Sequence, residues 1–177
     1  MNINNMFAGN EMAESIRRNY KILESESDRG AVLVASSVIE KGLADLISSF
    51  LLESENKKDE LFTSQNAPLA TLEAKIAIAF RLGLIREKVR NYLNIFRRIR
   101  NDFAHNIETY SFDNQSVVNR LNEIYSIRKQ ESDALDEIFT AAGKVATARD
   151  KFLLFFSMDM AAIQRASQTV ERLKPLD

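Results

Sequence analysis

The residues best suited to chemistry lie near the middle of the chain, at the end of a basic segment. Between Arg81 and Arg100 there are seven Lys or Arg residues and one acid, Glu87, so this segment carries +6 and the rest of the chain −7. The only histidine, His105, lies five residues after the end of this segment. An imidazole titrates near neutral pH, and concentrated positive charge attracts anions. The segment therefore predicts either acid–base chemistry on a phosphate or binding of an acidic partner.

Arg100 and His105 form an Arg-x4-His pair, with Asn101 beside the arginine. Positions five apart on a helix differ by about 140° in direction, so this pair converges only at a frayed helix end or in a dimer. Arg97, Asn101 and His105 follow at intervals of four and share a helix face, so they are the better-aligned set. Candidate contacts to RNA phosphates or to an acidic partner are Arg97, Arg98, Arg90 and Lys88.

A structural role explains the same residues. Asn101 and His105 would then cap the end of the helix and tie it to a neighbour, and Arg100 would pair with an acid. Charged helix faces are usually only solvated, so the pattern alone leaves catalysis open.

The composition excludes several kinds of site. Without cysteine there is no disulfide, no thiolate zinc site and no thiol nucleophile, and one histidine excludes a histidine-rich metal site within one chain. Glu40, Asp45 and Glu73 could gather on facing helices, but the Glu-x-x-His pairs of dimetal bundles do not occur. We therefore expect no metal and no cofactor.

Length and composition are typical of one soluble domain. The chain has 177 residues, 45% of them hydrophobic. Its first residues lack the basic start and apolar stretch of a signal peptide, and apolar runs such as 153–156 are too short to cross a bilayer. We expect a cytoplasmic protein without membrane contact, with a mobile N-terminus (1–9) and a single helical domain (10–174).

The hydrophobic pattern predicts an all-α, single-domain antiparallel helical bundle. With five glycines and two prolines, the chain has little material for hairpin turns. Apolar residues at helical spacing predict helices at about 10–26, 28–53, 70–82, 86–104, 116–129, 131–147 and 148–173. Ser27 and Ser116 are the expected N-caps of two of them.

The broad apolar surface of helix 28–53 predicts a central position, with Gly30 and Gly42 marking close approach of another helix. Phe96 and Phe103, seven residues apart on the basic helix, are predicted core residues. The phenylalanines of the last helix belong either to the core or, if exposed, to a homodimer face. These apolar surfaces lead us to expect a homodimer.

Three segments together resemble a known family. They are 26–35 (ESDRGAVLVA), 67–76 (APLATLEAKI) running into 82–85 (LGLI), and 99–105 (IRNDFAH). Their order and spacing resemble the mannitol operon repressor family of bacterial regulators, over roughly residues 26–125. The resemblance implies an all-helical fold without a recognised DNA-binding motif.

The last of these segments is also similar to the Arg-x4-His motif of HEPN domains, which are helical bundles found in toxins and RNases. In active HEPN ribonucleases, the matching Arg and His come from two subunits and form a metal-independent RNA-cleaving site. The resemblance would make Arg100 and His105 catalytic, with Asn101 at the polar position after the arginine.

Two functions follow as hypotheses. The first is a mannitol-repressor-like regulator that acts as a helical dimer through contacts with a partner protein. The alternative is a HEPN-type endoribonuclease with a composite Arg100/His105 site, which would bind RNA. Direct DNA binding is disfavoured, because the pI is about 6.0 and no helix-turn-helix pattern is visible.

Overall fold

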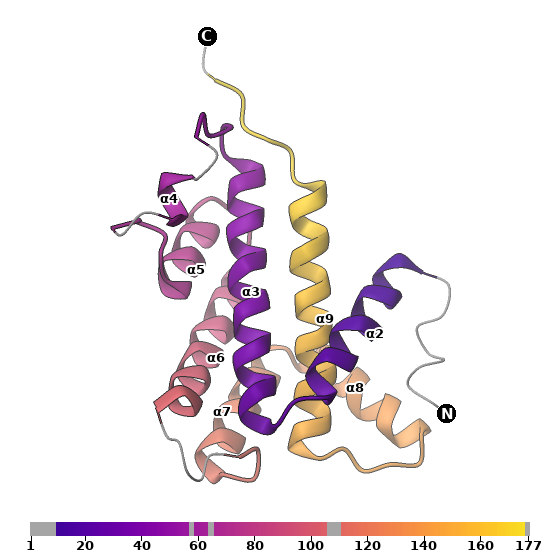
Figure 1. Ribbon diagram of the computed structural model, residues 1–177. Coiled ribbons are helices and arrows are strands. Elements are labelled where there is room, and N and C mark those ends of the chain that lie inside the picture. The colour runs from indigo at the N-terminus through magenta and orange to yellow at the C-terminus, as the bar shows by residue number, and fades with distance from the viewer. Residues whose placement is uncertain (1–9, 57–58, 64–65, 106–110, 176–177) are drawn as a thin grey trace.

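The computed structural model describes residues 10–56, 59–63, 66–105 and 111–175, and the predicted mobile segment 1–9 lies outside them. The described residues form helices and no strands, which confirms the all-α prediction (Figure 1). The helices are α2 (Glu11–Glu24), α3 (Asp28–Phe50), α4 (Glu60–Thr63), α5 (Leu72–Arg81), α6 (Glu87–His105), α7 (Gln115–Ile127), α8 (Lys129–Ala141) and α9 (Ala148–Thr169). None of these helices is long and apolar enough to cross a membrane.

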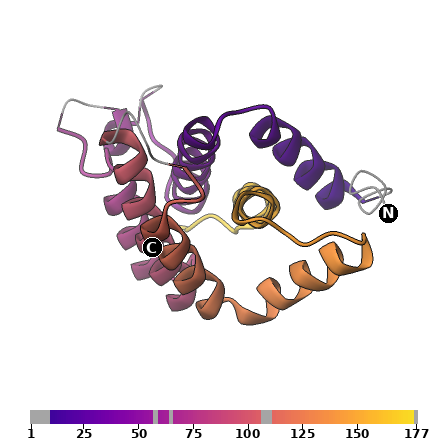
Figure 2. The same ribbon diagram turned by 90° about the horizontal axis from the view of Figure 1, so that it is seen from below.

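Helices α3 and α9 lie side by side at the centre of the bundle (Figures 1 and 2). Helix α3 also contacts α2, α5 and α6, which confirms its predicted central position. The two central helices run in the same direction, so their C-terminal ends are adjacent, and the Leu173 N–H donates to the Phe50 carbonyl at 2.7 Å. The bundle is therefore not antiparallel throughout.

Close approach of the two central helices depends on Gly42 of α3. A Cβ atom at this position would lie 2.8 Å from Cγ2 of Ile163 on α9, which is closer than a real methyl group can come. Gly42 costs helix propensity but allows this contact, as predicted. The same prediction is wrong for Gly30, where the nearest atoms to an added Cβ belong to the Glu26 side chain and not to another helix.

Aromatic rings fill the space between α6 and α9. Phe96 and Phe103 of α6 are both 0% exposed, as predicted. The Phe96 ring centre lies 4.2 Å from that of Phe156, and Phe152 lies 4.5 Å from Phe156. The phenylalanines of α9 are therefore core residues and offer no exposed face for a dimer.

Local capping residues set most helix starts. The Ser27 hydroxyl accepts a hydrogen bond from the Gly30 N–H at 3.1 Å, as predicted for an N-cap. The Ser116 prediction is wrong, because Asn114 caps α7 and accepts from the Ser116 N–H at 3.0 Å. Helix α8 ends at Ala141, although the prediction placed its end at residue 147. The helix stops early because Gly143, two residues later, takes a φ of 69°, which is outside the helical region.

Candidate functional site

The basic helix α6 borders a polar groove shared with α3 and α5. The groove has a volume of about 350 Å³. Its lining residues are Glu40, Ala70, Thr71, Leu72, Glu73, Arg97, Arg100 and Asn101. Three of the predicted site residues, Arg97, Arg100 and Asn101, therefore meet in one groove, although Arg100 leaves the helix in a different direction from Asn101.

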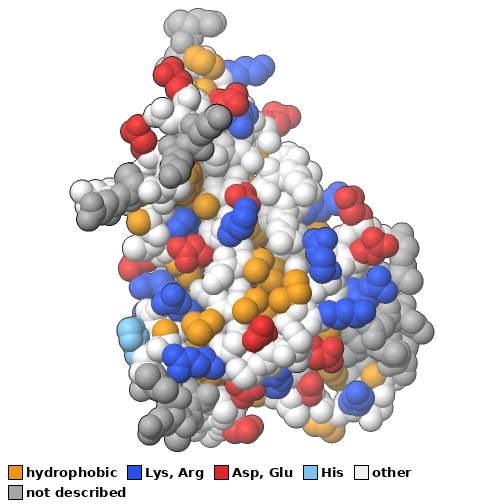
Figure 3. Space-filling model, viewed as in Figure 1, with side chains coloured by type: hydrophobic (Ala, Val, Ile, Leu, Met, Phe, Trp, Pro, Cys, Tyr) orange, Lys and Arg blue, Asp and Glu red, His pale blue; other side chains and the backbone are white. Residues whose placement is uncertain are grey.

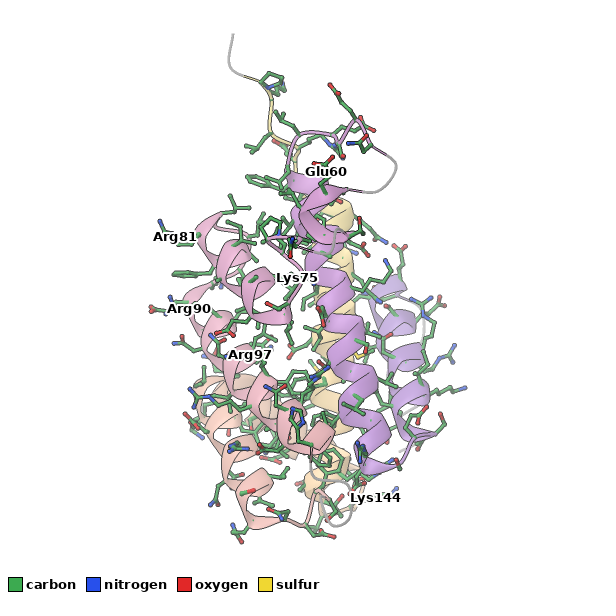
Figure 4. All side chains as sticks on the ribbon, turned by 60° about the vertical axis from the view of Figure 1, so that its left-hand side comes forward. Glu60, Lys75, Arg81, Arg90, Arg97 and Lys144 are labelled. Carbon is green, nitrogen blue, oxygen red and sulfur yellow. The ribbon has the colours of Figure 1, made fainter. Side chains whose placement is uncertain are left out.

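Ion pairs neutralise the acids of this groove. Arg97 Nη1 lies 2.9 Å from Glu73 Oε2, and on the other wall Lys75 Nζ lies 2.7 Å from Glu40 Oε1. Lys75 and Arg97 lie in the region between α3 and the α5–α6 pair (Figure 4). Pairing with lysine and arginine makes these carboxylates poor candidates for metal ligands, and the described residues contain no cluster of acids or histidine that could hold a metal.

Two groups in the groove retain hydrogen-bonding capacity. The Nε atom of Arg97 is buried and has no hydrogen-bond partner among the described residues. Arg100 Nη1 donates to the Asn101 side-chain oxygen at 3.2 Å, and no acid in the described part of the chain forms an ion pair with Arg100. Among the described residues, an amide therefore takes the place of the expected acid partner of Arg100. The groove can therefore accept an anion.

His105 lies apart from this groove. It is the last residue of α6, it is exposed, and it is not among the lining residues. The space-filling view shows the histidine at the edge of the molecule, beside Lys and Arg side chains (Figure 3). Arg29 satisfies the end of this helix by donating from Nη2 to the Ala104 carbonyl at 3.0 Å. Within one chain, Arg100 and His105 do not meet.

The remaining predicted basic residues point in different directions around α6. Arg98 is exposed. Arg90 lies over the Phe80 ring at 4.1 Å and donates to Glu87 at 3.0 Å. Lys88 is exposed on the other side of the helix and lines a second cleft. The basic residues of α6 therefore serve more than one surface.

Asp28 and Arg29, in the first turn of α3, have structural roles. Asp28 accepts a hydrogen bond from the Phe112 N–H at 2.9 Å and pairs with Arg149 Nη1 at 2.6 Å. The start of α3 is thereby tied to the segment before α7 and to the first turn of α9. Together with the Arg29 cap, these bonds hold the end of α6 that carries His105.

The second cleft was not predicted from the sequence. It lies between α3, α6, α8 and α9 and has a volume of about 490 Å³. At its polar end, the Arg128 guanidinium contacts Asp159 Oδ1 and donates from Nε to Glu131 at 3.2 Å. The same guanidinium lies 5.1 Å from the Tyr92 ring centre. The available signal was Asp159 itself, an acid within the apolar sequence FFSMDMA.

Asp159 is the most perturbed acid of this cluster. It is 4% exposed, and burial raises the pKa of its carboxyl to about 6, although Arg128 and the Tyr92 hydroxyl act in the opposite direction. Its second oxygen, Oδ2, is buried and accepts no hydrogen bond of good geometry from the described residues. A buried acid with a perturbed pKa beside a cleft is a functional candidate.

The raised pKa predicts a pH dependence of stability. Folded Asp159 keeps its proton up to about pH 6, whereas an unfolded aspartate loses it near pH 3.9, so the folded state binds more protons between these values. The free energy of unfolding contributed by this group should fall by about 2–3 kcal/mol as the pH rises from 4 to 6. Urea unfolding across this range, wild type against Asp159→Asn, measures it. An identical pH profile for the two proteins would contradict the assignment.

The described residues form an all-helical bundle with a polar groove at α6 and a second cleft beside α9. The sequence profile described as "MtlR: Mannitol repressor" matches residues 21–170, so this chain belongs to the mannitol repressor family. The match extends beyond the segment 26–125 that carries the resemblance and includes all of α9. No curated protein sequence matches the chain.

Two solved structures share the fold. One is the MtlR–HPr complex from Escherichia coli, with a TM-score of 0.60 and 13% identity, covering 85% of this chain and 99% of that one. The other is described as a possible transcriptional regulator, YggD from Shigella flexneri, with a TM-score of 0.60 and 15% identity, covering 86% and 95%. At these identities the likeness extends to the fold alone.

Proposed function

We propose that this protein is a regulator that acts by binding a partner protein. Its membership of the mannitol repressor family carries the proposal. One family member of similar fold was solved as a complex with HPr, so an HPr protein is the first partner to test here. The proposal is consistent with a chain that belongs to a family of regulators but shows no helix-turn-helix pattern in its sequence.

The contact surface we propose is the exposed face of α6 around Arg98. Arg98 is exposed and forms no ion pair within the described residues, so its charge is free to meet a partner's acid. Arg90 is half-buried and lies with Arg81 at the outer edge of the bundle (Figure 4). Complementary charge at a protein interface raises the rate of association and disfavours wrong partners.

Charge reversal at this surface tests the proposal. Arg98→Glu should weaken binding of HPr by about tenfold or more, because the substitution opposes like charges across the interface. Arg165→Glu is the matched control, since Arg165 is also an exposed helical arginine but lies on α9. Isothermal titration calorimetry measures both. Equal weakening by the two variants would remove α6 as the specific contact surface, and no binding by wild type would remove HPr as the partner.

A composite ribonuclease site is the second candidate. The groove at α6 presents Arg97, Arg100 and Asn101, and the Arg100 guanidinium, which pairs with no acid of the described residues, could stabilise a phosphorane. Attack of the RNA 2′-hydroxyl on the adjacent phosphate also needs a general acid or base, which His105 could supply. Because His105 lies outside this groove in its own chain, the histidine of the site would have to come from a second copy in a two-fold dimer.

The ribonuclease candidate has a direct test. Wild type should cleave mixed RNA in EDTA and leave 2′,3′-cyclic phosphate ends, whereas Arg100→Ala and His105→Ala should each reduce cleavage by about 100-fold or more. A mixture of the two variants should regain part of the activity, because a mixed dimer contains one intact site. Sedimentation gives the oligomeric state. A monomer of 20.1 kDa, or intact RNA with folded wild type, would remove this candidate.

A further inference from the structure

The cleft between α3, α6, α8 and α9 is lined mainly by apolar side chains. Its volume of about 490 Å³ lies within the range of about 300–1,000 Å³ that binding pockets occupy. The apolar lining residues are Leu46, Leu84, Ile85, Val89, Tyr92, Ala162, Ile163 and Ala166. Ala162 is exposed, and Val89 and Ala166 are half-buried, so part of this lining faces solvent. Because apolar surface gains free energy when it leaves water, the cleft favours an apolar group from another molecule.

The charged residues of the cleft leave one cation without an acid. Arg128 is shared between Asp159 and Glu131. Lys88 lies close enough to Glu131 for the two charges to interact. Arg86 is exposed, lines the cleft and forms no ion pair with the residues that the structure describes. Since the sequence from 81 to 90 has four Lys or Arg residues and one acid, the rim of the cleft at Arg86 is positive.

A surface of the opposite charge lies at the C-terminal end of α3, at the top of the molecule (Figure 1). Of the four large hydrophobic residues that are exposed in the described part of the chain, two, Leu52 and Leu173, lie at this end. Leu52 is 51% exposed, and the nearby Glu53 and Glu55 are exposed and form no ion pair with described residues. The sequence from 51 to 60 has four acids and two lysines. Exposed apolar residues that lie together indicate a contact surface, and this one is acidic.

The cleft and the Leu52 surface lie at the same end of the bundle. Leu46, in the cleft, precedes Leu52 by six residues, which corresponds to about 10 Å along α3. Arg86 directly precedes α6, at the opposite end of this helix from His105. A two-fold axis beside this end can therefore bring the Leu52 surface of each copy to the cleft of the other.

We propose that a second copy of this chain docks on the cleft and places its Leu52 against the apolar lining. The acids Glu53 and Glu55 then face Arg86. In a two-fold dimer this contact occurs twice, and each contact buries an exposed leucine and joins opposite charges. The inference does not depend on binding of HPr. Because the contact lies at the opposite end of α6 from His105, this dimer does not form the composite ribonuclease site.

Sedimentation equilibrium of the full chain measures the contact. At low ionic strength, wild type should pass from a monomer of 20.1 kDa to a dimer between about 1 and 200 μM. Leu52→Asp should weaken the dimer by about tenfold or more, because it removes the apolar group that the cleft buries. The matched control is Ile22→Asp, since Ile22 is also an exposed hydrophobic residue but lies on α2, outside both surfaces. This control should dimerise as wild type does.

Ala162→Trp tests whether the second copy occupies the cleft. Ala162 lines the cleft but is exposed, so a larger side chain there fills the cleft without entering the core. The variant should be a monomer over the same range of concentration. Ala77→Trp, at an exposed alanine of α5 outside the cleft, is the control and should form the dimer. Urea unfolding confirms that these variants fold.

A mixture of two charge-reversed variants tests the pairing of charges. Arg86→Glu alone and Glu53→Lys/Glu55→Lys alone should each weaken the dimer by about tenfold, because like charges then meet in both contacts. When the two variants are mixed, opposite charges meet in both contacts of the mixed dimer, so association should recover. Arg17→Glu, at an exposed arginine of α2, is the control for Arg86→Glu and should dimerise as wild type does.

Three results would overturn the proposal. The first is a wild type that stays a monomer at every concentration. The second is a dimer that Leu52→Asp or Ala162→Trp leaves intact, because the two copies would then meet through another face. The third is a mixture of the two charge-reversed variants that associates no more strongly than either variant alone.

Discussion

Replacing Phe96 with alanine should lower the free energy of unfolding by about 3–5 kcal/mol. The side chain is 0% exposed, and its ring lies 4.2 Å from Phe156 and 6.1 Å from Phe152 between α6 and α9. This cost has two parts. The protein loses the free energy gained by burying the ring, and the close-packed core cannot fully close the cavity that the ring leaves. Chemical denaturation followed by circular dichroism gives the value.

Phe103→Ala should cost a similar amount, since this ring is also 0% exposed. Phe80→Ala is the matched control, because Phe80 is half-buried under the Arg90 guanidinium and its removal leaves no closed cavity. Its cost should be well below that of Phe96→Ala. A loss under about 1 kcal/mol at Phe96 would mean that α6 packs with a different face toward α9.

Replacing Arg128 with leucine should destabilise the fold by about 3–5 kcal/mol at neutral pH. Arg128 is the cation that pairs with the buried carboxylate of Asp159, so its removal leaves this acid either charged without a partner or protonated at neutral pH, and both states cost free energy. The substitution also removes the guanidinium from the Tyr92 and Phe155 rings. Urea unfolding at pH 7 measures the loss.

The double variant Arg128→Leu/Asp159→Leu separates charge from packing. It should recover most of the stability, because a buried ion pair replaced by apolar residues is often neutral or stabilising. Lowering the pH should also reduce the cost of Arg128→Leu, since Asp159 then takes up a proton and becomes neutral. Equal instability of the single and double variants at every pH would show that lost packing, not the buried charge, is the cause.

Local patterns in the sequence predicted most of the secondary structure. Ser27 starts α3 as an N-cap because its hydroxyl bonds to an N–H three residues away, which a sequence displays directly. Phe96 and Phe103 lie on the buried side of α6 because residues seven apart share a helix face. Where the prediction erred, as at the cap of α7, a neighbouring residue with the same chemistry competed successfully.

The direction of α9 relative to α3 was not visible in the sequence. The pattern of apolar residues indicates that both helices are buried, but it does not indicate which way a helix runs. The segment from 51 to 147 is long enough to bring the chain back beside the start of α3. Helix α9 therefore begins beside the start of α3 and runs in the same direction, and Leu173 meets Phe50 at the common end.

The sequence predicted which residue types the candidate site contains, but not which of them meet in one groove. The basic character of α6, the Arg100–Asn101 pair and the single histidine are properties of the sequence alone. Packing against α3 and α5 places Arg100 in a groove and leaves His105 outside it, because the two side chains leave the helix in different directions. Arg128 and Asp159 meet across 31 residues through the folding of α9 against the α7–α8 corner. Burial, which raises the pKa of Asp159, arises from residues distant in the chain, so no local pattern could predict it.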